Sequence, residues 1–501
     1  MKLLILFFGL IPTVIFGAEK NIIFFITDDQ SPTLGCYGDP VAATPAVDAL
    51  AGDGMFFRNA FATTASCSAS RSVVMSGLHN HKNGQYGHTH DFHKFESFRN
   101  VISFSLPRVL ADVGYRTIQI GKYHVAPEEV FHFETYLHAN SRNAVEMANE
   151  CEKEIKAKDD RPFFIYFATS DPHRSAGVDK HFSGKHKPNL FGNLKDKQHH
   201  NLVKEVFYKG KEVIVPPFLP DTAESRSELA HYYQSCARID QGLARLVELL
   251  KEAGLYDKTM IVFTADHGMA FPGGKTTVYE GGLRVPFVVR NPYEQKRGIE
   301  SDAMVSHVDI TPSLLDFAGG LDGENNAPKN LLNSKAYWKS KSYVNKDNLG
   351  GNHKWKSYHG RSWLPVLGKT GRENRDMIYA SHTFHEIQMY YPMRVIQDRS
   401  YKFIWNIASA LPYPFASDLF AASTWQAQLE KGNDAPYGTK TVGEYVQRAP
   451  FELFAIDKDP YEKYNLALDP QYAGVLATYK EKLKAFQIEM HDPWVLKWKY
   501  E

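Results

Sequence analysis

The sequence predicts an α/β fold in which a large, mostly parallel sheet is flanked by helices. Continuous apolar runs, typical of strands buried on both faces, occupy residues 21–27, 117–120, 162–169 and 259–264. Helical patterns lie between these runs, most clearly over residues 225–253. Strands that alternate with helices favour a parallel sheet covered on both sides.

Each of the four predicted strands ends in a cluster of polar side chains. The clusters are Asp28-Asp29, Gly121-Lys122, Asp171-Pro172-His173 and Asp266-His267-Gly268. Ligands of open α/β sheets bind outside the carboxyl ends of the strands. We therefore expect these side chains to share one site.

The composition of the sequence changes after residue 321. Residues 322–360 are rich in Asn, Lys, Gly and Ser, which is typical of a long surface excursion. Short β-rich runs over 377–405 and a helical pattern over 472–490 then predict a smaller α+β region with an antiparallel sheet. We expect a catalytic domain over residues 19–375 and a C-terminal domain over 376–501 that completes the substrate pocket.

Composition limits the classes of partner. The chain has 501 residues, of which 43% are apolar and 23% charged, as in ordinary globular proteins. Lys and Arg total 58 against 57 Asp and Glu, so the formal net charge is +1. This balance excludes binding of nucleic acid through bulk charge.

The first residues resemble a targeting segment. Lys2 precedes an apolar run over residues 3–16, which small residues and then charges follow. We expect a cleaved secretory signal over residues 1–18, with an uncleaved N-terminal anchor as the alternative. The mature chain is then secreted or periplasmic, or lysosomal-like in a eukaryote, and no later apolar run is long enough to span a membrane.

The segment Cys67-Ser68-Ala69-Ser70-Arg71 places a cysteine and an arginine one turn apart at a predicted helix start. Taken alone, it also fits a buried structural cysteine. Further motifs follow in order: G-K-Y-H at 121–124, T-A-D-H-G at 264–268, and Lys275 before E-G-G-L-R-V-P at 280–286. Together with the acids after the first strand, these segments resemble the type I sulfatases, which implies an alkaline-phosphatase-like fold.

The resemblance implies a chemistry for each motif. In that family the cysteine is oxidised by a formylglycine-generating enzyme to Cα-formylglycine, whose hydrated gem-diol attacks sulfur and then expels sulfate from a hemiacetal. The catalytic residues implied are Cys67, Arg71, Lys122, His124, His173 and Lys275. The metal ligands implied are Asp28, Asp29, Cys67, Asp266 and His267.

Elementary chemistry supports the same assignment. Three Asp carboxylates that converge repel one another unless a cation lies between them, and oxygen ligands suit one hard divalent ion, Ca²⁺ before Mg²⁺. Arg71, Lys122 and Lys275 supply the positive charge that an anionic sulfuryl group requires. His124 and His173 are the candidates for acid–base catalysis, with His173 protonating the leaving group.

The resemblance extends to one subfamily, the sulfamidases (heparan N-sulfatases). It includes R-P-F-F-I-Y-F-A-T-S-D-P-H-R at 161–174 and S-H-T-F-H-E-I-Q-M-Y-Y-P-M-R at 381–394. Three features depart from that pattern, namely Ala69 in place of Pro, Lys275 with its following glycines, and the unmatched stretch 175–213. Release of sulfate from a terminal sugar is therefore expected, with N- and O-sulfate both open.

The segment 382–394 is the candidate for contacts with the sugar. His382, His385, Glu386 and Arg394 are expected to bind a uronate, sulfate or amino-sugar group. The alternative is an ordinary polar loop between domains.

Two other functions stay open at this point. One is a phosphodiesterase or phosphonate monoester hydrolase of the same superfamily, and the other is a catalytically inactive glycan-binding relative. The phosphodiesterase or phosphonate hydrolase is disfavoured, because Lys122, His124 and Lys275 would occupy the place of its second metal ion. The inactive relative is disfavoured, because Cys67, Arg71 and the three acids are all intact. The expected partners are a sulfated saccharide and the maturing enzyme, and a dimer is left open.

Overall fold

The structure is a computed structural model that describes residues 20–500 apart from 91, 176, 196–197 and 330–356. The expected signal segment and most of the expected surface excursion lie outside the described residues. Within the described residues, no helix is long and apolar enough to cross a bilayer. Cys36, Cys67, Cys151 and Cys236 are all unpaired.

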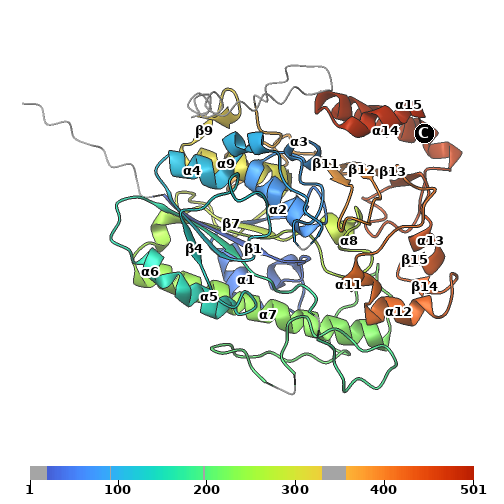
Figure 1. The fold of residues 1–501 in the computed structure, drawn as a ribbon, viewed down its shortest axis with the longest axis horizontal. Helices are drawn as coiled ribbons and strands as arrows, with labels where there is room; N and C mark the ends of the chain where they lie inside the picture. The colour runs from blue at the N-terminus through green and yellow to red at the C-terminus, as the bar shows by residue number, and fades with distance from the viewer. Residues whose placement is uncertain (1–19, 91, 176, 196–197, 330–356, 501) are drawn as a thin grey trace, which may run out of the picture.

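An eight-stranded sheet forms the centre of the molecule (Figure 1). Its order is β4-β3-β5-β1-β6-β7-β2-β8. The strands are β1 (Asn21–Thr27), β2 (Met55–Phe61), β3 (Arg116–Gly121), β4 (Thr135–Leu137), β5 (Phe163–Ala168), β6 (Thr259–Ala265), β7 (Phe287–Arg290) and β8 (Ile299–Ser306). Only β7 runs antiparallel to both of its neighbours, so the prediction of a mostly parallel sheet is confirmed.

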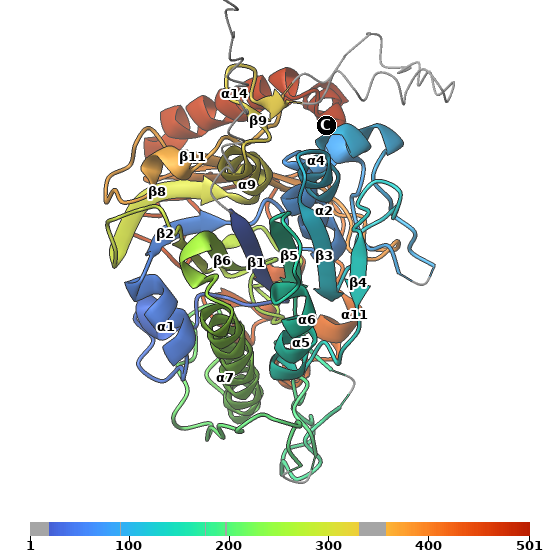
Figure 2. The same cartoon turned by 90° about the vertical axis from the view of Figure 1, so that its left-hand side faces the viewer.

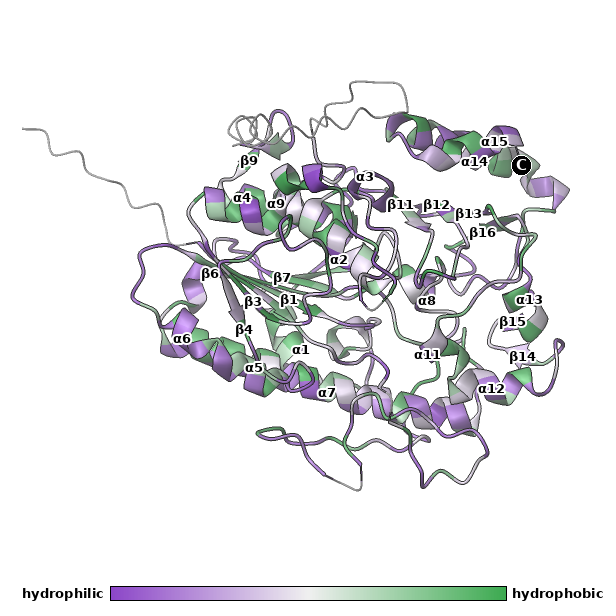
Figure 3. Ribbon diagram, viewed as in Figure 1, coloured by the Kyte–Doolittle hydropathy of each residue, from purple (hydrophilic) through white to green (hydrophobic). Residues whose placement is uncertain are grey.

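Helices cover both faces of this sheet (Figure 2). One face packs against α1 (Pro45–Gly52), α5 (Ala144–Glu150) and the long α7 (Ala223–Glu252), and the other against α2 (Cys67–Ser76), α4 (Leu106–Asp112) and α9 (Ile310–Ala318). The central strands β1, β5 and β6 are mostly apolar and buried along their whole length, whereas α7 is amphipathic, as Figure 3 shows in colour. The burial of both sheet faces explains the continuous apolar runs in the sequence.

A second sheet, antiparallel and four-stranded, lies beside the first. Its order is β11-β12-β13-β16, formed by Met377–His382, Met393–Asp398, Lys402–Asn406 and Phe451–Phe454. One face packs on α14 (Ala473–Glu489), and the other shares a core with residues of the main body. The antiparallel sheet is thus confirmed, while the boundary at residue 375 stays a prediction.

Short elements complete the chain. They are α3 (Asn80–Asn83), α6 (Glu152–Ile155), α8 (Glu280–Leu283), β9 (Leu321–Asp322), β10 (Ala327–Pro328), α11 (Ser417–Phe420), α12 (Ser423–Leu429), β14 (Pro436–Tyr437), β15 (Lys440–Thr441), α13 (Val442–Val446) and α15 (Lys497–Tyr500). Of these, α11 and α12 bring the C-terminal region against α7 and the strand ends.

Candidate active site and metal site

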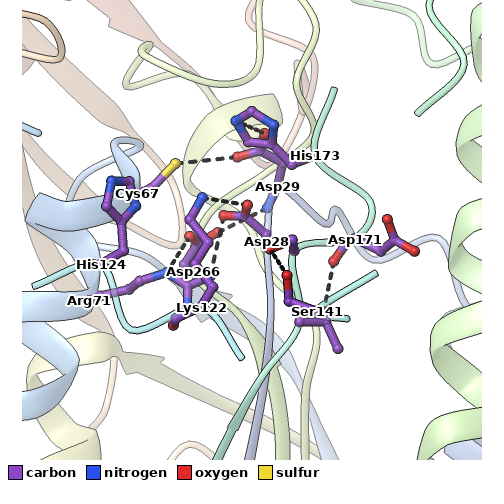
Figure 4. A network of polar contacts seen from close by, with 12 residues as sticks. Asp28, Asp29, Cys67, Arg71, Lys122, His124, Ser141, Asp171, His173 and Asp266 are labelled. Carbon is purple, nitrogen blue, oxygen red and sulfur yellow. Dashed lines mark hydrogen bonds and ion pairs between the residues drawn. The ribbon is translucent and has the colours of Figure 1, made fainter. Parts of the chain in front are cut away.

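The carboxyl ends of four adjacent strands bring the predicted side chains together. β3, β5, β1 and β6 are consecutive in the sheet, so the loops that follow them meet at one edge. Figure 4 shows Cys67 and its cationic neighbours gathered around the acids from β1 and β6. The two elements that add to this edge are α2, which Cys67 begins, and the loop that carries Lys275.

The two acids after β1 lie on a strained turn. Asp29 has φ = 62°, in the left-handed region that non-glycine residues rarely adopt. Its backbone N–H donates to Oδ1 of Asp266 at 2.9 Å, and the N–H of Asp28 donates to the carbonyl of Asp171 at 3.1 Å. These bonds hold the turn, and such strain is typical of functional sites.

Asp28, Asp29, Asp266 and His267 have the chemistry of a metal site. All four side chains are fully buried, as is Cys67. Nε2 of His267 lies 3.1 Å from Oδ1 of Asp29 and 3.3 Å from Sγ of Cys67. Because Nδ1 of His267 lies 3.0 Å from the carbonyl oxygen of Gly268, it carries the proton, which leaves the Nε2 lone pair toward the acids.

The charges of this cluster show why a cation fits. Burial raises the pKa of Asp266 to about 6, and the nearby carboxylate of Asp28 adds to the effect. Burial would also raise the pKa of Asp28, but the charge of Lys122 holds it well below its usual range. Three buried carboxylates that meet at one point are the oxygen-rich set that a hard divalent cation prefers.

Arg71 and Lys122 neutralise part of this negative charge. Arg71, one turn along α2 from Cys67, donates to Asp28 at 3.2 Å and to Asp266 at 3.0 Å. Nζ of Lys122 lies 2.5 Å from Oδ2 of Asp28. Burial raises the pKa of the Cys67 thiol well above its usual value, so an unmodified Cys67 is a poor nucleophile.

Lys275 is the centre of a second group of contacts. Its Nζ lies 3.2 Å from Asp29, 2.9 Å from Nε2 of His173 and 3.0 Å from Asp418. Nδ1 of His173 lies 2.6 Å from the carbonyl oxygen of Arg174 and therefore carries the proton, so its Nε2 accepts from Lys275. Sequence reasoning missed Asp418, because α11 carries no motif that distinguishes this acid from a surface residue.

His124 lies among other histidines. It has φ = 52°, and its Nε2 lies 2.8 Å from Nδ1 of His90. Nε2 of His88 in turn lies 2.8 Å from Nε2 of His385. The H-T-H sequence over residues 88–90 was the signal for this group, and the sequence reasoning did not use it.

The predicted sugar-binding residues have unlike surroundings. His385 lies between Oγ of Ser66, at 2.9 Å, and His88, so it reaches the loop before Cys67. Glu386 is partly exposed and accepts a hydrogen bond from Ser417 at 2.8 Å. His382 is buried, and its Nδ1 has no hydrogen-bond partner among the described residues.

Arg394 is not brought to this group. It is buried on β12, with its Nε 2.5 Å from Asp492 and its guanidinium 4.5 Å from the ring centre of Trp494. A charge so fully engaged has no donor directed at a substrate. The placement favours a structural role for Arg394 over the predicted contact with the sugar.

The residues of the site differ in their exposure to solvent. The side chains of Lys122, His173 and Asp418 are 17%, 26% and 25% exposed, whereas those of Asp28, Asp29, Arg71 and Lys275 are at most 1% exposed. Lys122, His173 and Asp418 are therefore the members of this group that solvent reaches most easily.

Comparisons with known proteins agree with this geometry. A family model described as Sulfatase matches residues 20–320. Human N-sulphoglucosamine sulphohydrolase is 35% identical over 494 residues, covering 95% of this chain and 91% of that protein. An ulvan-active sulfatase of Formosa agariphila is 28% identical over 485 residues, covering 93% and 78%.

The fold is shared with solved structures as well. One protein, solved in complex with its substrate D-glucosamine-2-N,6-O-disulfate, superposes with a TM-score of 0.60 at 19% identity, covering 95% of this chain and 98% of that one. The family match spans more than half of the chain and includes the strand ends that carry the acids and Cys67. The chain belongs to the sulfatase family.

Proposed function

We propose that this protein hydrolyses sulfate from the terminal sugar of a sulfated saccharide, with oxidised Cys67 as the nucleophile. The observation that carries the proposal is the position of Cys67. It begins α2 at full burial, with His267 3.3 Å from its sulfur and Lys122 and Lys275 on the neighbouring acids. The other three cysteines have different surroundings: Cys151 and Cys236 lie in the apolar core, and Cys36 packs at the edge of that core beside Asp48.

Oxidation of Cys67 to Cα-formylglycine supplies a hydrated aldehyde that can attack sulfur and later release the sulfate. The residues around it have distinct tasks in this proposal. Arg71, Lys122 and Lys275 neutralise the charge of the sulfuryl group as it develops in the transition state. The N-terminus of α2 adds backbone N–H groups that favour an anion at the same place.

One divalent cation, Ca²⁺ before Mg²⁺, belongs to the proposed site. Asp28, Asp29, Asp266 and His267 would hold it together with the oxidised side chain of residue 67. Its chemistry is to withdraw charge from the oxygens of the reacting groups. The fit of the residues rests on their burial and on the lone pair that His267 directs toward Asp29.

His173 and His124 are the proposed acid–base groups. Nε2 of His173 faces the same space as Lys275 and Asp29, beside the path that the leaving group takes. We assign to it the protonation of the leaving nitrogen or oxygen, with the proton coming from Nζ of Lys275, which donates to Nε2 of His173 in the resting site. His124 lies across the opening and assists release of sulfate from residue 67.

Two observations concern the sugar. Most side chains of the site are fully buried and only Lys122, His173 and Asp418 are partly exposed, which favours a chain end over an internal residue. The 35% identity to N-sulphoglucosamine sulphohydrolase extends over 95% of the chain and supports an N-sulfated glucosamine there. His382, His385 and Glu386 are the proposed contacts, with Glu386 at the exposed end.

The hydrolysis of phosphonate or phosphodiester is the weaker candidate. A second metal ion would need acidic ligands where Lys122 and Lys275 now donate to Asp28 and Asp29. A maturing enzyme for Cys67, export through the N-terminal segment and a secreted or periplasmic location complete the proposal.

The test combines mass and activity. After co-expression with a formylglycine-generating enzyme, the peptide with Cys67 should weigh about 18 Da less, because oxygen replaces the thiol sulfur and two hydrogens. That protein should release sulfate from N-sulfoglucosamine. Cys67→Ala should abolish turnover, whereas Cys151→Ala, which removes a buried cysteine of the core, should retain it. Equal turnover in Cys67→Ala and the parent would end the proposal.

A further inference from the structure

Three histidines at the mouth of the site share a geometry that the sulfatase chemistry does not require. His88, His90 and His124 each offer a ring nitrogen, and these nitrogens all lie within 4.8 Å of one another. The ring centre of His88 lies 4.5 Å from that of His90 and 5.0 Å from that of His124. The proposed reaction uses only His124 of the three.

We propose that His88, His90 and His124 form a second metal site, distinct from the acidic one, that takes Zn²⁺ or a similar transition-metal ion. Bound there, the ion holds the lone pair of His124 and inhibits turnover. The inhibition rests on the proposed role of His124 in the sulfatase reaction, whereas the binding of the ion does not depend on that role.

The backbone brings the three rings together. His88 and His90 are two residues apart in an irregular segment after α3, and their ring centres lie 4.5 Å apart. His124 comes from the loop after β3, where its φ of 52° turns the side chain toward them. Nε2 of His88 lies 2.8 Å from Nε2 of His385, and Nδ1 of His88 lies 3.4 Å from Oγ of Ser68. These two contacts hold the orientation of the His88 ring, and binding of an ion would replace one of them.

The distances suit a tetrahedral ion after a small movement. Two nitrogen ligands of Zn²⁺ lie about 3.3 Å apart when each Zn–N distance is about 2.0–2.1 Å. Nδ1 of His90 and Nε2 of His124 are now 2.8 Å apart, so these two rings must separate by about half an ångström. The ligand nitrogen of His88 lies within 4.8 Å of both and must be brought to a similar distance. Three protein ligands leave the fourth position to water or to a substrate atom.

The donor set selects the metal. All three ligands are imidazoles, which suit Zn²⁺, Cu²⁺ and Ni²⁺, whereas Ca²⁺ and Mg²⁺ require oxygen. Burial lowers the pKa of both His88 and His124, with neighbouring charges adding to the effect, so both rings are neutral and available at neutral pH. The nearby cations Lys122 and Arg71 are paired with Asp28 and Asp266, which reduces their repulsion of an incoming ion.

The binding test uses Cys67→Ala protein saturated with Ca²⁺, so that neither maturation nor turnover matters. Calorimetric titration with Zn²⁺ should show one ion per chain while Ca²⁺ stays bound, as metal analysis after dialysis will show. Co²⁺ should give the intense visible absorption of a tetrahedral ion. Adding His90→Gln should weaken binding by about tenfold or more. His90 is exposed, so the fold does not depend on it.

The matched control is His132→Gln, which removes a surface histidine that lies 3.7 Å from Glu128, and it should bind Zn²⁺ as the parent does. Displacement of Ca²⁺ by Zn²⁺, a weak octahedral Co²⁺ spectrum, or equal affinity in His90→Gln would each overturn the site.

The second arm uses matured enzyme with intact Cys67. Zn²⁺ should inhibit each variant relative to its own zinc-free rate, with a concentration dependence about tenfold weaker in His90→Gln. Binding without inhibition would overturn the inhibitory role assigned through His124. Absence of activity in every zinc-free sample would instead contradict the sulfatase proposal and leave the binding result standing.

Discussion

Removal of the buried negative charge of Glu228 should weaken the attachment of the loop that carries His173 and lower the free energy of unfolding. Arg174 follows His173 directly, and its guanidinium makes two parallel bonds to Glu228 of α7, at 2.7 and 2.8 Å. Glu228 also accepts from Thr424 at 2.7 Å, so the same carboxylate joins the loop, α7 and α12. Glu228→Gln keeps the shape but places an amide N–H against the guanidinium.

The size of the effect follows from the pKa of Glu228. Burial would raise it, but the charge of Arg174 lowers it from 4.5 to about 2. A depressed pKa in the folded protein means that the carboxylate stabilises the fold above pH 4.5 and that this is lost as the pH falls toward 2. At 1.36 kcal/mol per pH unit, the contribution is about 3 kcal/mol at pH 7 and about 1 kcal/mol at pH 3.

Urea unfolding of the parent and of Glu228→Gln over this pH range measures the effect. The difference in unfolding free energy should shrink as the pH falls. Glu248→Gln is the control, because Glu248 lies on the same helix, is 64% exposed and pairs with Arg245 at 3.2 Å. It should change stability by less than about 0.5 kcal/mol. A Glu228→Gln difference that is small, or constant with pH, would refute the reasoning.

Other substitutions separate the proposed roles. Asp266→Asn should lose the metal, as elemental analysis will show. Thermal unfolding with Ca²⁺ at about 100 times the Kd of the parent should then show a loss of about 3 kcal/mol of ligand-linked stability. Full metal content in this variant would contradict the assignment. Glu386→Gln should raise KM for a saccharide by roughly 10–100-fold and spare a small aryl sulfate. Arg394→Ala should instead destabilise the fold by about 3–5 kcal/mol, because Asp492 is left buried without its partner, and leave KM unchanged. An increase in KM for Arg394→Ala with unchanged stability, together with an unchanged KM for Glu386→Gln, would instead support Arg394 as the contact with the sugar.

Much of the fold could be predicted because parallel strands leave a strong signal. The expected strand over residues 21–27 coincides with β1, and the helix expected over 225–253 differs from α7 by two residues at its start and one at its end. Polar clusters at strand ends are likewise visible in one dimension, because each follows a buried run. The meeting of the acids with Lys122 and His173 then follows from the order of β3, β5, β1 and β6, whereas Cys67 is brought to them by α2, which follows β2.

Contacts made by single residues from distant segments could not be predicted in the same way. Asp418 reaches Lys275 from a four-residue helix that no hydrophobic period marks. Arg394 is of a residue type that often binds an anionic substrate. Its guanidinium is instead paired with Asp492 and packed against Trp494, about a hundred residues later in the chain. Such pairings depend on how the antiparallel sheet packs against the C-terminal helices, and no local pattern encodes that.

The charges at the strand ends predict that binding of the metal and binding of the substrate depend on each other. Asp28, Asp29, Asp266 and Asp418 bring four negative charges, against three positive charges from Arg71, Lys122 and Lys275. Without a metal the site is therefore formally −1 and repels a sulfate. A divalent cation changes this to +1, and in a buried site that reversal acts at low effective dielectric. Loss of the metal should thus weaken binding of the sulfated group itself as well as the chemical step, which is why stability, metal content and KM belong in one set of measurements on Asp266→Asn.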